Sequence, residues 1–421
     1  MTVLIKNARV IDPTSTLHNS IQDIYIEAGV ISHIGGRKDI SADTVVEADD
    51  LHVSPGWVDI FSNFCDPGFE FKETLESGSY AAAAGGFTDV FVIPNTKPVV
   101  DNKSQVEYIT RTSSNLAARV HALGAITKNT DGKELAEMYD MRNSGAVAFT
   151  DGLNPVQSAG MLLKALQYVK AFDGVIIQIP DDKSVGANGL VHEGIVSTRL
   201  GLAGKPMMAE ELLVARDIKL TRYTESRLHF TGVTSPRSLE YIRRAKEAGL
   251  HVTCSVTPYH LFFTDANLDT YDTNFKVYPP LRSANEQAAL RDAIRDGTID
   301  CIATHHMPHE YDSKVLEFEY ARNGMIGLET CYAALKTSMP DVPDEKWVAL
   351  LSGNPRKIFG LTESTVAKAQ PANLTLFSPS LTSAIDKNYF YSKSSNSAFT
   401  GNTLRGKVIG TVSGESLFLR K

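Results

Sequence analysis

The chain has 421 residues, 43% of them hydrophobic and 22% charged, which is typical of a globular protein large enough to bury a core without disulfides. The formal net charge is −7 and no long basic run occurs, so we expect no nucleic-acid partner, because phosphate contacts need a clustered positive surface. No apolar stretch approaches the roughly 20 residues needed to cross a bilayer, and the apolar run at the N-terminus is too short for a signal peptide. Together with four cysteines that form no CxxC pair, this predicts a cytoplasmic protein with reduced thiols and no membrane partner.

Short strand-like segments occupy both ends of the chain. Residues 2–53 contain several alternating or apolar runs, and near the C-terminus similar runs lie at 374–377 and 406–412. Because isolated strands are unstable, we expect the two ends to pair into one small β-sandwich domain, formed by residues 1–54 and 367–421.

The middle of the chain, residues 55–366, alternates short apolar runs with segments that could form helices. The runs lie at 57–61, 89–93, 119–124, 145–150, 174–179, 227–233, 251–256 and 300–304. Eight runs separated by helices predict an α/β fold, a parallel (β/α)₈ TIM barrel. An open doubly wound sheet is the alternative, but no glycine-rich phosphate-binding motif follows an early run, so we favour the barrel.

One helix can be predicted in detail. Ser235 supplies an N-cap and Pro236 a first-turn proline. Apolar residues then recur at near-helical spacing, and Gly249 is expected to end the helix. The apolar residues are Leu239, Ile242, Ala245 and Ala248.

Motifs from residue 55 to 329 resemble those of dihydroorotase, a cyclic amidohydrolase of the amidohydrolase superfamily. In family order they are Pro-Gly-Trp-Val-Asp at 55–59, Gly-Gly-Phe-Thr at 85–88, Pro-Asn-Thr at 94–96, Gly-Leu-Ala-Gly at 201–204, Thr-Pro-Tyr-His at 257–260, Lys-Val-Tyr-Pro-Pro-Leu-Arg at 276–282, Gly-Thr-Ile-Asp at 297–300 and Gly-Leu-Glu at 327–329. The terminal strands also resemble the small β domain of that family. The resemblance therefore covers nearly the whole chain.

The resemblance implies a site for two zinc ions at the carboxyl ends of the barrel strands, where they would activate a bridging water. The positions that match the family's metal ligands are Phe61, Asn63, Asp151, Ile179, Gly232 and His305. Among these six residues, only Asp151 keeps the family's residue type, although His305 could also bind a metal. No histidine lies between His52 and His121 or between His121 and His192, so a shifted alignment does not restore the ligands. We therefore predict a divergent member with vestigial ligand positions, no bound metal and no catalytic residue.

Four further residues match substrate-pocket positions of the family. Asn95 and His309 correspond to residues that contact substrate, Cys65 replaces a carboxylate-binding arginine, and Tyr278 replaces an asparagine and is expected to fill space. Several alternatives stay open. His305, His306, His309 and His260 could form a new single-metal site, Cys65 could act as a nucleophile beside His305, and Asp181-Asp182 could be an acid–base pair rather than a capping turn.

Three functions are consistent with these residues. The first is a non-catalytic dihydroorotase homologue of pyrimidine biosynthesis, forming a homo-oligomer and binding aspartate carbamoyltransferase or an active dihydroorotase. The second is a hydrolase of cyclic amides that binds zinc through a changed ligand set at Asp151, His305 and His309. The third is a sensor that binds a small molecule through Asn95 and His309.

Overall fold

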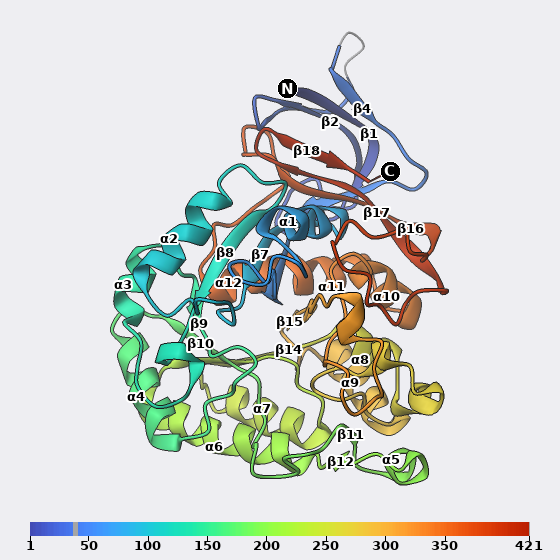
Figure 1. Cartoon of the computed structure of the whole chain (residues 1–421). Helices are drawn as coiled ribbons and strands as arrows, with labels where there is room; N and C mark the ends of the chain where they lie inside the picture. The colour runs from blue at the N-terminus through green and yellow to red at the C-terminus, as the bar shows by residue number, and fades with distance from the viewer. Residues whose placement is uncertain (37–40, 421) are drawn as a thin grey trace.

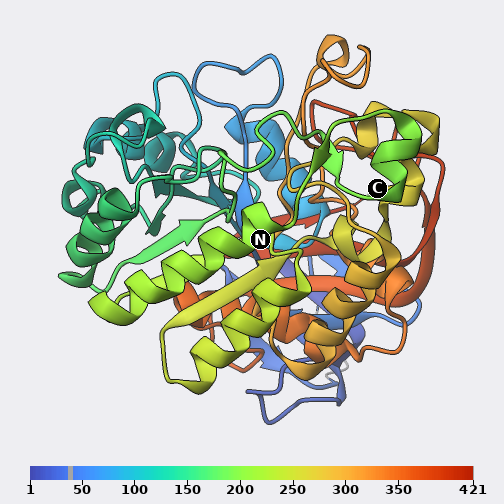
Figure 2. The same cartoon turned by 90° about the horizontal axis from the view of Figure 1, so that it is seen from below.

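The computed structural model of the chain describes residues 1–36 and 41–420 (Figure 1). A barrel of eight parallel strands forms the larger part, and Figure 2 shows helices around it. The second sheet, built from both ends of the chain, lies beside the barrel and carries both termini (Figure 1). The predicted TIM barrel with a β domain from the two ends is confirmed. The ranges 1–54 and 367–421 include residues 37–40 and 421, which lie outside the described residues.

The barrel strands pair in chain order, and each overlaps one of the expected apolar runs. They are β6 (Trp57–Ser62), β7 (Phe87–Val92), β8 (Arg119–Gly124), β9 (Ala148–Phe149), β10 (Val175–Gln178), β13 (Arg227–Phe230), β14 (Val252–Val256) and β15 (Cys301–Ile302). The ring closes between its first and last strands, where Ser62 bridges His306 and the backbone N–H of Asn63 donates to the carbonyl of His306 at 2.9 Å. This closure places the residues after β15 directly beside those after β6.

Helices connect the strands on the outside of the barrel. They are α1 (Leu75–Ala84), α2 (Lys103–Thr112), α3 (Met138–Asn143), α4 (Ala159–Lys170), α5 (Ile195–Leu200), α6 (Met208–Thr224), α7 (Pro236–Glu247), α8 (Pro258–Phe262), α9 (Ala284–Asp296), α10 (Cys331–Ser338), α11 (Asp344–Val348) and α12 (Asn354–Phe359). A short two-stranded ribbon, β11 (Val191–His192) with β12 (Gly204–Lys205), flanks α5. No helix among residues 1–36 and 41–420 has the length and apolar character needed to cross a membrane.

Helix α7 begins where the sequence predicts. The Ser235 hydroxyl accepts from the backbone N–H of Arg237, and Pro236 occupies the first turn. Leu239, Ile242 and Ala245 are buried, whereas Ala248 is exposed. Ala248 is the exposed C-cap, and Gly249 follows it with a φ of 76°. The left-handed glycine ends the helix as predicted: the backbone N–H of Gly249 donates to the carbonyl of Lys246 at 2.9 Å, and that of Leu250 donates to the carbonyl of Ala245 at 3.0 Å.

The β domain joins the two chain ends through β5 (His52–Pro55). This strand pairs in parallel with β1 (Thr2–Val10) and antiparallel with β16 (Asn373–Ala384). The remaining strands are β2 (Ile21–Glu27), β3 (Val30–Ile34), β4 (Thr44–Val46), β17 (Thr403–Ser413) and β18 (Ser416–Leu419). Their buried side chains form a core separate from that of the barrel.

The segment between β16 and β17 crosses back to the barrel. The Asn396 amide donates to the carbonyl of Met307 at 3.0 Å and accepts from the backbone N–H of His309 at 3.0 Å. The carboxylate of Glu329 accepts from the backbone N–H groups of Tyr391 and Ser392. The loop after β15 is therefore held by residues nearly 90 positions later in the chain.

Candidate functional site at the barrel mouth

Apolar side chains fill part of the barrel mouth. Phe61 at the end of β6 and Ile179 after β10 are fully buried in one cluster of the barrel interior. The Phe61 ring packs on the His305 ring, with centroids 4.6 Å apart and the planes tilted by 35°. Neither Phe61 nor Ile179 offers a lone pair to a metal ion.

His305 is the first residue of a hydrogen-bonded network that runs from the barrel mouth into the barrel interior. Its Nε2 lies 2.8 Å from the Thr231 hydroxyl, which accepts from Ser255 at 2.9 Å. Ser255 in turn contacts Nε2 of His229 at 3.1 Å, and Nδ1 of His229 lies 2.8 Å from the hydroxyl of Thr253. Burial lowers the pKa of His305 to about 3, so its ring is neutral at neutral pH.

Gly232 leaves no room for a ligand side chain. A Cβ at this position would lie 2.7 Å from Cε1 of His305, and the backbone φ of 70° is one that L side chains rarely adopt. A histidine at this position would therefore require both His305 and the backbone to move.

Asp151 is bound by protein donors. Its Oδ1 accepts from the backbone N–H groups of Ile126 and Thr127 at 2.9 Å each, and its Oδ2 accepts from the Thr127 hydroxyl at 2.5 Å. Burial nevertheless raises the pKa of Asp151 to about 6, against the opposing effect of these hydrogen bonds. The carboxylate links β9 to the loop that follows β8.

Asn95 and Asn63 use their side-chain amides within the protein. Asn95 donates to the carbonyl of Asp151 at 3.1 Å and accepts from the backbone N–H of Leu153 at 3.0 Å. Asn63 Oδ1 accepts from the backbone N–H of Cys65 at 2.9 Å. Both amides order loops at the mouth.

Cys65 lacks the properties of a nucleophile. The side chain is buried, and burial raises the pKa of the thiol to about 12. A thiol with so high a pKa is protonated at neutral pH and reacts slowly.

The histidines after β15 do not converge on one point. His309 Nε2 lies 2.9 Å from the carbonyl of Asn323, and burial lowers the pKa of His309 to about 4. His306 Nδ1 accepts from the backbone N–H of Gly327 at 3.2 Å. His260 bonds the Thr257 hydroxyl at 2.8 Å through Nδ1 and a proline carbonyl through Nε2.

The side chains at the six positions that match the family's metal ligands do not provide enough donors for a pair of zinc ions. These positions are Phe61, Asn63, Asp151, Ile179, Gly232 and His305. Three of the six side chains have no donor atom, and those of Asn63, Asp151 and His305 already bond protein groups. Each zinc ion needs about four donors. Within the part of the chain that the structure describes, no group of three or more His, Cys, Asp or Glu side chains is placed to hold a metal ion.

A cavity of about 460 Å³ lies beside the filled positions. Tyr278 and Asp181 line it, and the Tyr278 hydroxyl donates to Asp181 Oδ2 at 2.6 Å. Lys205, from the short β12, forms an ion pair with Asp181 Oδ1 at 2.8 Å, and both side chains are nearly buried. The ion pair is not apparent from the sequence, in which Asp181 and Asp182 are adjacent and equivalent. Asp182 caps a turn, by accepting from the backbone N–H of Ser184 at 2.9 Å, whereas Asp181 binds Lys205.

Solved structures with this architecture include hydantoinases. L-hydantoinase (dihydropyrimidinase) from Arthrobacter aurescens has a TM-score of 0.87 at 24% identity, covering 100% of this chain and 96% of its own. D-hydantoinase from Thermus sp. has a TM-score of 0.83 at 20% identity, covering 99% of this chain and 95% of its own. At this identity the likeness establishes the hydantoinase-type fold alone.

Sequence relatives define the family more closely. The family described as Dihydro-orotase-like matches residues 51–238. Dihydroorotase from Pelotomaculum thermopropionicum is 40% identical over 98% of this chain and 97% of its own length. Dihydroorotase from Geobacter metallireducens is 39% identical over 100% of both chains. The chain belongs to the dihydroorotase-like family.

Proposed function

We propose that this chain is a dihydroorotase-like protein of pyrimidine biosynthesis that has lost the catalytic reaction and acts as a structural partner of aspartate carbamoyltransferase or of an active dihydroorotase. The observation that carries the proposal is the packing of Phe61 on His305 beside Gly232, in the place where the family resemblance puts metal ligands. The family and the full-length identity to dihydroorotases support the link to pyrimidine biosynthesis.

The chemistry of the mouth supports inactivity. Hydrolysis of a cyclic amide needs a strong nucleophile and a group that stabilises charge on the carbonyl oxygen. The Cys65 thiol is protonated at neutral pH. The Asp151 carboxylate is taken up by three protein donors, and one face of the neutral His305 ring lies against Phe61. These groups do not form a nucleophile and its base.

Dihydroorotase activity is the competing candidate, and the names of the relatives favour it. It would require a changed ligand set at Asp151, His305 and His309. An assay of dihydroorotate hydrolysis, with and without added zinc, separates the two, using the Pelotomaculum thermopropionicum dihydroorotase as positive control. We expect no hydrolysis above background; zinc-dependent turnover would overturn the proposal of inactivity.

The partner requires a separate experiment. We further propose that the protein is cytoplasmic and homo-oligomeric; the four cysteines are all buried and unpaired, as expected for a reducing compartment. Tagged chain should co-purify with aspartate carbamoyltransferase or an active dihydroorotase from the same cells. The structural role would be contradicted if the chain is a monomer by analytical ultracentrifugation and co-purifies with neither enzyme.

A further inference from the structure

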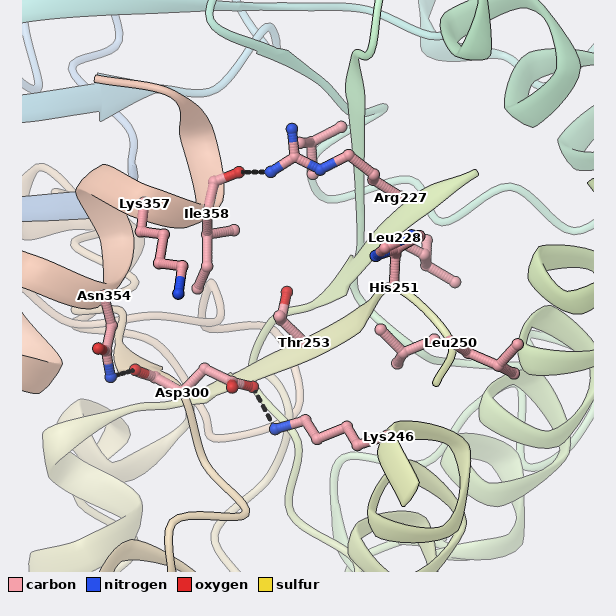
Figure 3. A pocket seen from close by; sticks show the side chains of 12 residues that line it. Arg227, Leu228, Lys246, Leu250, His251, Thr253, Asp300, Asn354, Lys357 and Ile358 are labelled. Atoms are coloured by element: carbon pink, nitrogen blue, oxygen red, sulfur yellow. Dashed lines mark hydrogen bonds and ion pairs between the residues drawn. The ribbon is translucent and has the colours of Figure 1, made fainter. Parts of the chain in front are cut away.

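A second cavity, of about 430 Å³, opens at the end of the barrel opposite the mouth (Figure 3). Its wall comes from the starts of β10, β13 and β14, from the end of α7 and the turn after it, and from α12. This end of a TIM barrel normally serves stability rather than catalysis. The proposed function does not use it.

Basic side chains dominate the charge of this basal cavity. Arg227 from β13, Lys246 from α7 and Lys357 from α12 stand around the opening in Figure 3, and Asp300 is the acidic residue among those that line it. The lining therefore carries more positive than negative charge, on a chain whose formal net charge is −7. A positive pocket on an acidic protein attracts a small anion rather than an extended polyanion.

Asp300 cancels the charge of Lys246 but not that of the other two basic residues. Its Oδ2 accepts from Lys246 Nζ at 2.6 Å and from the backbone N–H of Cys254 at 2.7 Å. Its carbonyl accepts from the Asn354 amide at 2.7 Å. Asp300 and Lys246 thus neutralise each other, which leaves Arg227 and Lys357 for an incoming anion.

Arg227 and Lys357 retain hydrogen-bond capacity. One Arg227 nitrogen donates to the carbonyl of Ile358, which fixes the guanidinium (Figure 3). A second pairs at 3.0 Å with Asp173, whose side chain is 82% exposed, so that the ion pair contributes little in water. The Lys357 side chain is exposed and makes no ion pair or hydrogen bond within residues 1–36 and 41–420.

We propose that the basal cavity binds a small phosphate monoester. A guanidinium held in place and a free ammonium group are the donors that phosphate oxygens prefer. The cavity volume falls within the range of small-molecule sites, and Leu250 and Ile358 give an apolar wall for the organic part of the ligand. The ligand is thus expected to carry a dianionic phosphate on a body about the size of a sugar.

Isothermal titration calorimetry with ribose 5-phosphate tests the site, with ribose and sodium chloride at matched ionic strength as controls. We expect ribose 5-phosphate to bind and both controls to give no binding. Lys357→Gln should weaken binding about tenfold, which corresponds to 1.4 kcal/mol, because it removes one charge-assisted hydrogen bond. Lys164→Gln, on the exposed face of α4 outside the cavity, should bind like the wild type.

Hydrogen exchange with ribose 5-phosphate locates the binding. We expect protection at residues 250–254 and 354–358 and none at the mouth. Four results would each overturn the proposal. Ribose 5-phosphate could fail to bind, or ribose could bind equally well. Both lysine variants could weaken binding equally, or the protection could be confined to the mouth. None of these results depends on catalytic activity, so the site can fail or stand independently of the proposed function.

Discussion

The carboxyl group of Asp151 gives the sharpest test of how the mouth is built. Burial raises its pKa from 3.8 to about 6, a difference of roughly two units, which amounts to about 3 kcal/mol of differential stability. Above pH 6 both folded and unfolded chains hold an ionised carboxylate, and the folded chain bears the full cost of burying it. As the pH falls through 6 the folded chain takes up a proton before the unfolded chain does, so the wild type gains stability until the pH falls below 3.8.

Asp151→Asn isolates this effect because asparagine keeps an oxygen for the backbone N–H groups of Ile126 and Thr127 but does not titrate. Urea denaturation of both proteins should show the free energy of unfolding of the wild type rising by about 2 kcal/mol, relative to the variant, from about pH 8 to about pH 4.5. Other titrating groups cancel in the difference. A carboxylate that serves as a metal ligand has a lowered pKa, and the wild type would then lose relative stability over the same range. That opposite slope, or no slope, would refute the reasoning.

Three further predictions concern single side chains. Phe61→Ala should lower the free energy of unfolding by about 3–5 kcal/mol in urea denaturation, because it empties a fully buried site. The control Phe71→Ala, at a side chain that is 57% exposed, should change the free energy of unfolding by less than about 0.5 kcal/mol. Equal effects of the two substitutions would contradict the packing of Phe61. Cys65 should resist iodoacetamide at pH 8 in the folded protein, because its thiol is buried with a pKa of about 12, and rapid labelling traced to Cys65 by mass spectrometry would show the opposite. Burial lowers the pKa of Lys314 from 10.5 to about 7. The wild type should therefore gain stability relative to Lys314→Met as the pH rises from 7 to about 10, because the unfolded chain then holds a proton that the folded chain has lost. Urea denaturation that gives the same difference in free energy of unfolding at every pH would contradict this.

The sequence predicted what depends on local pattern. The eight apolar runs became barrel strands because their side chains are buried on both faces, and Ser235 with Pro236 began α7 because the cap and the first-turn proline act within one turn.

Features made by distant residues could not be read from the sequence. The ion pair of Lys205 with Asp181 joins a two-residue strand to the end of β10, and no spacing signals it. Asn396 fixes the loop after β15 from nearly 90 positions later in the chain. The basal cavity brings Arg227 and Lys357 together from β13 and α12, and both would pass for ordinary surface residues in the sequence. Such contacts are set by closure of the barrel and return of the C-terminal segment rather than by local propensity.

Metal analysis of the purified protein decides whether the barrel mouth still binds a pair of metal ions. The chain should be expressed in zinc-supplemented medium, purified without chelator and analysed by inductively coupled plasma mass spectrometry, beside the Pelotomaculum thermopropionicum dihydroorotase. We expect far less than one equivalent of zinc or any other divalent metal per chain. Two equivalents of metal that depend on Asp151 and His305 would show that the mouth still holds a metal pair.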